Sequence, residues 1–134
     1  RAGGQAPDSL LDMLFMDDQS HCFTAGRGLG QTESLLALLA SAVPCQDRSF
    51  ETLLPVVRSR LSLLSGCICI FLDWDSDRQK LIKQLQSANI PTLGLIIARE
   101  EGLAEPLDRS CLQNSQSSLH VLQLNRIQED LLAL

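Results

Sequence analysis

The sequence contains no tyrosine and few other aromatic residues, namely four phenylalanines and one tryptophan in 134 residues. A hydrophobic core built by this chain must therefore consist mainly of leucine, isoleucine and valine. Clusters of basic residues are also absent, because the eleven lysines and arginines are scattered and the net charge is −5. Nucleic-acid binding needs clustered Lys and Arg to meet the phosphates. We therefore expect no nucleic-acid partner.

No C-x-x-C pair occurs, although the chain has five cysteines, which cannot all pair with one another. Zinc-finger and thioredoxin-type sites therefore lack their basic unit. Cys67 and Cys69 stand within an apolar run, where a free cysteine behaves as a small hydrophobic residue. This use of cysteine indicates a reducing compartment.

A signal peptide and an apolar stretch of about 18 residues are both lacking, so we expect no membrane span in this chain. The first residue is Arg1 rather than Met, and we expect the chain to be a fragment of a longer protein. Its length fits a single domain, residues 1–134. Within it we expect a flexible start over residues 1–9 and a surface loop over residues 99–118.

The order of apolar patterns predicts an α/β fold. The run "CICIFLD" (67–73) is apolar up to its last residue, which is typical of a strand buried on both faces of a parallel sheet. The alternation of strands and helices after residue 31 predicts a three-layer architecture with a mostly parallel sheet. The predicted elements are a hairpin at 10–26, helices at 31–43, 49–66, 76–89 and 125–134, and strands at 67–73, 90–98 and 118–124. For the helix at 31–43 we expect Gln31 or Thr32 as the N-cap.

Three aspartates follow that apolar run in "IFLDWDSDR" (70–78). An EF-hand loop starting at Asp73 would need Gly where Arg78 stands and Glu where Gln84 stands, so that calcium site is excluded. Helix-start chemistry explains the other two aspartates, with Asp75 or Ser76 as the N-cap and Asp77 in the first turn. Asp73 remains, at the strand end where open α/β sheets place their ligands.

An alternative reading is enzymatic. "IFLDWDS" resembles the opening motif of haloacid-dehalogenase-like phosphotransferases, in which Asp73 would be the nucleophile and Asp75 the acid/base. That family places the motif on its first strand and ends the next strand in Ser or Thr, whereas this next strand ends in Ala98 and Arg99. Lys80 and Lys83, the nearest lysines, fall on the outward side of the predicted helix. The sequence therefore favours a non-catalytic role.

The glycine-rich segment "GRGLGQTES" (26–34) precedes a helix but matches neither the Walker A loop nor the dinucleotide fingerprint. We interpret it as a strand-to-helix turn. Trp74, between two aspartates on a loop, is the aromatic candidate for a contact with a protein partner.

The stretches "CFTAGRGLGQTESLLALLASAVPC" (22–45) and "GCICIFLDWDSDRQKLIKQLQSANIP" (66–91) together resemble a bacterial family of unknown function. The resembling part is the family's C-terminal, von Willebrand factor A-like portion. The resemblance implies a Rossmann-like sheet, association with MoxR-type AAA ATPases, and a membrane-anchored N-terminal region that would tether the domain to the cytoplasmic side. It further implies that Asp73 and Thr32 match two of three loops that hold a divalent ion such as Mg²⁺.

The third of those loops, D-x-S-x-S, has no full match, because "DQSHC" (18–22) carries Cys22 in place of the final Ser. The metal site is therefore expected to be incomplete, and the first strand and helix of the fold to lie upstream of Arg1. Their absence leaves an exposed sheet edge, which recruits partners or a second copy. We thus predict a protein-interaction module whose binding face comprises Gly28, Thr32, Asp73, Trp74 and Asp75.

Overall fold

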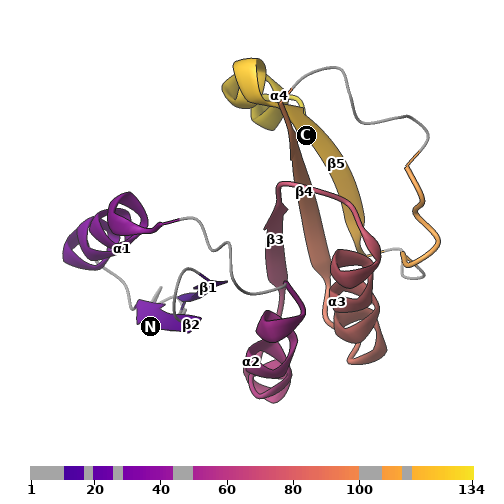
Figure 1. Ribbon diagram of the computed structural model, residues 1–134, viewed down its shortest axis with the longest axis horizontal. Coiled ribbons are helices and arrows are strands. Elements are labelled where there is room, and N and C mark those ends of the chain that lie inside the picture. The colour runs from indigo at the N-terminus through magenta and orange to yellow at the C-terminus, as the bar shows by residue number, and fades with distance from the viewer. Residues whose placement is uncertain (1–10, 17–19, 26–28, 44–49, 100–106, 113–115) are drawn as a thin grey trace, which may run out of the picture. The chain divides into compact units, whose positions relative to one another are not determined.

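The structure, a computed structural model, describes residues 11–16, 20–25, 29–43, 50–99, 107–112 and 116–134. The chain divides into two compact units, Arg1–Val57 and Arg58–Leu134. Both units combine helices with strands, and the second holds a parallel sheet (Figure 1). The α/β class expected from the sequence is therefore confirmed.

The first unit contains the predicted hairpin. Strands β1 (Leu11–Met16) and β2 (Ser20–Ala25) pair antiparallel, with Leu14 opposite Cys22. Helix α1 (Leu29–Ser41) contacts β2, and the short 3₁₀ helix η1 (Phe50–Leu53) contacts β1. Residues 17–19, between the two strands, lie outside the described residues.

Helix α1 begins earlier than the sequence pattern indicated. Its first residue is Leu29, so both Gln31 and Thr32 lie inside the helix. An N-cap residue has a non-helical backbone, and the prediction that one of these two caps the helix is therefore wrong. Gly30, which we assigned to the preceding turn, is accommodated within the helix at a modest cost in backbone entropy. The end at Ser41 agrees with the expected stop before Pro44.

The helical stretch predicted over residues 49–66 is divided into short pieces. They are η1, α2 (Leu54–Arg58) and η2 (Leu61–Leu63). Pro55 is the second residue of α2, within the first turn, where a residue without an N–H group breaks no helical hydrogen bond. The α-helical part of this stretch therefore begins at Leu54, five residues after the predicted start.

The second unit is built around a three-stranded parallel sheet. Its strands β3 (Cys67–Phe71), β4 (Thr92–Ala98) and β5 (Ser118–Gln123) lie in the order β3-β4-β5, so β4 is central (Figure 1). Helix α3 (Ser76–Ser87) links β3 to β4, and the chain closes with η3 (Leu124–Arg126) and α4 (Ile127–Leu132). This arrangement is compatible with a Rossmann-like fold. None of the described helices combines the length and apolarity needed to cross a membrane.

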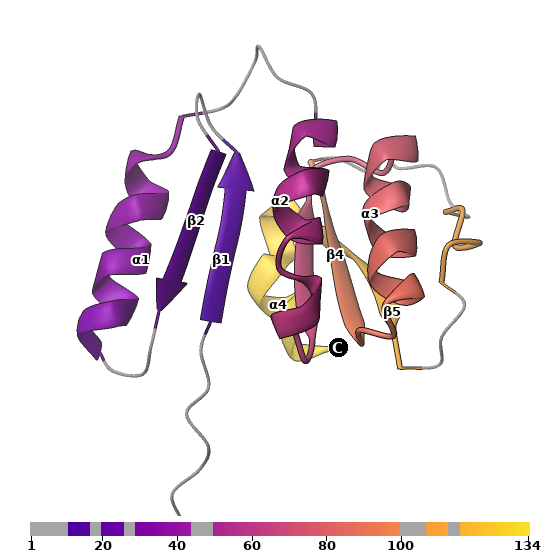
Figure 2. The same cartoon turned by 90° about the horizontal axis from the view of Figure 1, so that it is seen from below.

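One face of this sheet forms the core with α3. Phe71, Ile96 and Leu119 are 3%, 0% and 5% exposed and project from neighbouring strands to the same side. Buried side chains of α3 complete this core: Leu81, Ile82 and Leu85. Gly94 leaves room for Leu119 at the centre, because a Cβ there would lie 2.7 Å from Cδ1 of Leu119 and that side chain would have to move. In Figure 2, α3 lies in front of the sheet and α4 behind it.

The opposite face of β3 is open. Ile68, Ile70 and Leu72 are 67%, 64% and 69% exposed, whereas Cys69 and Phe71 between them are buried. The prediction that this strand is buried on both faces is therefore wrong. The physical reason is position: β3 stands at the edge of the described sheet, where α3 covers only one of its faces.

Candidate functional site

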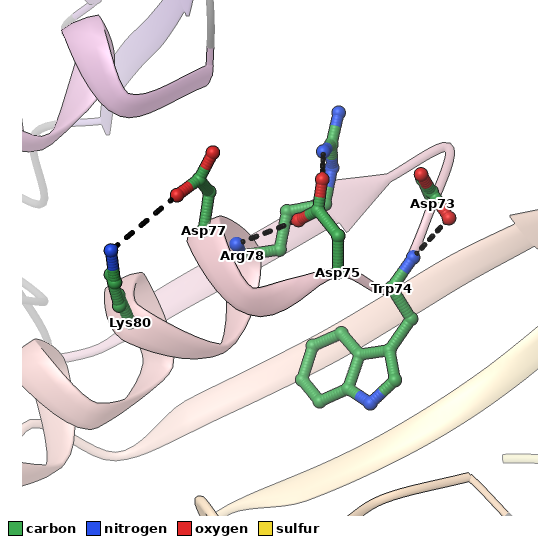
Figure 3. Close-up of polar contacts among 6 residues, drawn as sticks. All are labelled: Asp73, Trp74, Asp75, Asp77, Arg78 and Lys80. Atoms are coloured by element: carbon green, nitrogen blue, oxygen red, sulfur yellow. Dashed lines mark hydrogen bonds and ion pairs between the residues drawn. The ribbon is translucent and has the colours of Figure 1, made fainter.

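Asp73, Trp74 and Asp75 lie in the loop between the carboxyl end of β3 and the start of α3 (Figure 3). The Asp73 carboxylate is exposed, and its Oδ1 accepts a hydrogen bond from the backbone N–H of Trp74 at 2.7 Å. This contact joins neighbouring residues and fixes the direction of the carboxylate as the chain leaves the strand. Asp73 therefore occupies the sheet end that the sequence assigned to it.

Asp75 is the N-cap of α3. Its backbone is extended (φ −108°, ψ −176°), and its Oδ1 accepts the N–H of Arg78 at 3.0 Å. Its Oδ2 accepts a second bond, 2.6 Å long, from Nη1 of Arg78. Burial acts to raise the pKa of Asp75, but the two hydrogen bonds and the positive charge of Arg78 together bring that pKa below its ordinary value. The carboxylate is thus held ionised by the helix that it caps.

Asp77 lies in the first turn of α3, and its carboxylate is 3.7 Å from Nζ of Lys80. Figure 3 shows that the three aspartates project separately, each toward its own partner. The expected helix-start roles of Asp75 and Asp77 are therefore confirmed, and each of these two carboxylates already interacts with a cation.

The three carboxylates do not converge on one point. Mg²⁺ and Ca²⁺ need several converging oxygen ligands, yet the described part of the chain holds no group of three or more His, Cys, Asp or Glu residues that could bind a metal ion. Thr32 belongs to α1 in the first unit, whereas Asp73 belongs to the second unit. Gly28, the other residue predicted there, lies outside the described residues.

Trp74 contributes to packing within the second unit. Its indole N–H donates to the backbone oxygen of Asp108 at 2.8 Å, and its ring centroid lies 5.9 Å from that of Phe71. The side chain is half-buried. The next residue, Arg109, is also bonded to the sheet, because its Nη1 donates to the backbone oxygen of Leu119 in β5 at 2.7 Å.

The sequence predicted a surface loop over residues 99–118, yet Asp108 and Arg109 in this stretch hydrogen-bond to Trp74 and Leu119. Cys111 is only 1% exposed. The one sequence signal was the presence of three apolar residues, Leu107, Cys111 and Leu112, within a polar stretch. That signal is too short to distinguish from chance.

A phosphotransferase would need a lysine close to Asp73, and the nearest lysines in the sequence are Lys80 and Lys83. Lys80 interacts with Asp77, and Lys83 is exposed on the surface of α3. A phosphoryl-transfer site needs a cation directed at the nucleophile and the transferred group. Among the described contacts, neither lysine interacts with Asp73.

Within the second unit, the described residues place no strand on the side of β3 away from β4. The N–H of Cys67 donates to the backbone oxygen of Pro91 at 3.0 Å, so the backbone groups of Cys67 are directed toward β4. Successive residues of a parallel strand direct these groups to alternate sides. The N–H and C=O groups of Ile68 and Ile70 therefore point away from β4, to a side where the described residues place no strand.

Cys67 and Cys69 form a close pair on the covered face of β3. Their sulfur atoms are 3.6 Å apart, and both thiols are free. Cys67 is half-buried and Cys69 is buried. The hydrogen bond with Cys69 lowers the pKa of the Cys67 thiol, while the same bond and burial raise the pKa of Cys69. The pair thus favours one thiolate, on the more accessible sulfur.

Comparison with known proteins adds no relative: no family model, no curated protein and no solved structure matches the chain. The site must therefore be interpreted from its own geometry.

Proposed function

We propose that this chain is a non-catalytic protein-interaction module with a three-layer, von Willebrand factor A-like fold and an incomplete metal site. The observation that carries the proposal is the open edge and face of β3. A row of three large apolar side chains is more than 60% exposed there, beside backbone groups that pair with none of the described strands. Exposed sheet edges bind further strands, and contiguous exposed apolar side chains mark interaction sites.

The partner that this edge accommodates most directly is a second copy of the chain. Two β3 strands that pair antiparallel about Cys69 would set Ile68 of one copy opposite Ile70 of the other. Both residues direct their backbone hydrogen-bonding groups outward, so such a pair would exchange two N–H···O bonds. The exposed apolar face would then continue from one copy to the next.

The loop at the end of β3 belongs to the same proposed surface. Asp73 is exposed beside Leu72, which is 69% exposed. An anionic group next to an apolar row contributes mainly to the specificity and rate of association. On the resemblance described above, we further propose that a MoxR-type AAA ATPase is a partner of the full-length protein, on the cytoplasmic side of a membrane.

Sedimentation velocity over a range of concentrations tests the proposal, together with amide hydrogen exchange of the 134-residue chain. We expect reversible, concentration-dependent association that Ile70→Lys abolishes. The matched control is Leu132→Lys on α4, which changes a side chain that is 81% exposed but lies outside β3. In the monomer, the amides of Ile68 and Ile70 should exchange faster than those of the central strand β4.

Slow exchange at Ile68 and Ile70 in a chain that stays monomeric would overturn the proposal, because the edge would then be covered within the chain. Fast exchange in a chain that does not self-associate would assign the edge to a different protein. The ATPase would then be the first partner to test, with the same two variants.

A further inference from the structure

We infer that Cys67 and Cys69 form a reversible dithiol oxidation site, in which a hydroperoxide oxidises Cys67 and Cys69 resolves the product to a disulfide. This inference goes beyond the proposed function and does not depend on it. It begins from geometry: the two sulfur atoms are 3.6 Å apart and extend to the same face of one strand. Their exposure differs, since Cys67 is half-buried and Cys69 is 6% exposed.

The two thiols are suited to different steps. A thiolate, not a thiol, attacks a peroxide, and sensor cysteines are accessible thiolates next to a second cysteine. The hydrogen bond between the sulfurs lowers the pKa of Cys67 and raises that of Cys69. Cys67 is therefore the attacking group, and the buried Cys69 keeps its proton until the second step.

The reaction balances with a hydroperoxide as the oxidant. The Cys67 thiolate attacks the outer oxygen of the peroxide, the O–O bond breaks, and the departing oxygen takes up a proton as an alcohol or water. Cys67 is then a sulfenic acid, oxidised by two electrons. The Cys69 sulfur attacks the Cys67 sulfur, the S–O bond breaks, and the hydroxide leaves with the Cys69 proton as water. One disulfide has formed and one peroxide has been reduced.

Closing the disulfide requires a local change in β3. Residues two apart in a strand have Cα atoms separated by roughly 6.6 Å, which lies near the upper limit for disulfides. Their side chains run parallel, so the strand must bend at Ile68 to bring the sulfurs into bonding distance. Such a bend is feasible because β3 pairs with β4 alone among the described strands. Strained disulfides are easily reduced, and we therefore expect the oxidation to be reversible.

The experiment uses the whole chain and hydrogen peroxide. After exposure, remaining thiols are alkylated and the chain is digested with trypsin. No Lys or Arg lies between Arg60 and Arg78, so one peptide, residues 61–78, carries Cys67 and Cys69 and no other cysteine. We expect this peptide to resist alkylation and to be lighter than the reduced, unalkylated peptide by the mass of two hydrogen atoms. Treatment with a thiol reductant should restore both alkylation sites.

Two single variants separate the roles. In Cys69→Ala the disulfide should be lost. Cys67 should accumulate as a sulfenic acid that dimedone captures, formed more slowly than in wild type because the hydrogen bond that lowers the pKa of Cys67 is gone. In Cys67→Ser the remaining Cys69 should stay reduced under the same conditions. Cys111, which is 1% exposed, lies on a different tryptic peptide and serves as an internal control that the chain has not unfolded.

Several outcomes would overturn the inference. A wild-type peptide 61–78 that remains fully alkylated while free glutathione in the same tube is oxidised would show that the pair does not react. If Cys69 in Cys67→Ser were oxidised as rapidly as in wild type, Cys67 would not be the group that attacks the peroxide. Circular dichroism of each variant before treatment confirms that it is folded, and Cys69→Ser provides a second variant if Cys69→Ala is not.

Discussion

Asp75 and Arg78 meet twice at the start of α3, once through the backbone and once through their side chains. The Asp75 carboxylate accepts the N–H of Arg78 at 3.0 Å with one oxygen and its guanidinium at 2.6 Å with the other. The two residues are three positions apart, which is the spacing at which an N-cap side chain meets the backbone of the first turn. The Asp75 side chain therefore stabilises the start of α3, so its substitution should lower the free energy of unfolding.

Asp75→Ala should destabilise the second unit by about 1 kcal/mol, the usual cost of removing an N-cap side chain. Asp75→Asn should cost less, because an amide oxygen still accepts the Arg78 N–H and only the ionic contact is lost. Urea denaturation of the two variants and wild type measures the difference. Equal losses in both variants would mean that the charge, rather than the cap, carries the stabilisation.

The same pair predicts how stability depends on pH. Arg78 holds the pKa of Asp75 below its ordinary value in the folded chain, against the opposing effect of burial. A carboxylate of this kind contributes stability that is present above its unfolded pKa of about 4 and is lost as the pH falls through the folded pKa. The stability difference between wild type and Asp75→Asn should therefore shrink as the pH falls from 6 toward 2. A difference that stays constant over this range would contradict the assignment.

The two faces of the sheet should respond differently to the same substitution. Ile96 lies on the central strand β4 and is 0% exposed. Ile96→Ala should therefore lower the free energy of unfolding by about 2–5 kcal/mol. Ile70→Ala removes one that is 64% exposed and should change the stability of the monomer by less than about 0.5 kcal/mol. Denaturation at a protein concentration low enough to keep the chain monomeric measures both. A large loss in Ile70→Ala would show that the face of β3 is covered.

The sequence predicted those elements whose signals are local. The hairpin, the strands β4 and β5, and helix α3 all follow from patterns within about a dozen residues. The cap at Asp75 follows from the chemistry of four residues. In these places, propensity, periodicity and capping all agree, and agreement between such levels makes a prediction reliable.

The remaining features depend on what is adjacent in space. The run "CICIF" is identical in sequence whether β3 is central or at an edge, so the exposure of Ile68 and Ile70 could not be predicted from it. Trp74 was interpreted as an exposed contact residue, but its indole bonds to Asp108, which is 34 positions away. The start of α1 was misplaced because Gly30 weakens a helical pattern without ending the helix.

The last prediction concerns the divalent ion that a von Willebrand factor A-like fold implies. Calorimetric titration with Mg²⁺ or Mn²⁺ should give no saturable heat for the wild-type chain, and Asp73→Ala should behave in the same way. The reason lies in the carboxylates, since Asp75 and Asp77 already interact with Arg78 and Lys80, which leaves Asp73 too few oxygen neighbours for a hard cation. Saturable binding that Asp73→Ala removes would make Asp73 a ligand. That result would revive both the adhesion-type metal site and the phosphotransferase mechanism, because each needs a cation beside this aspartate.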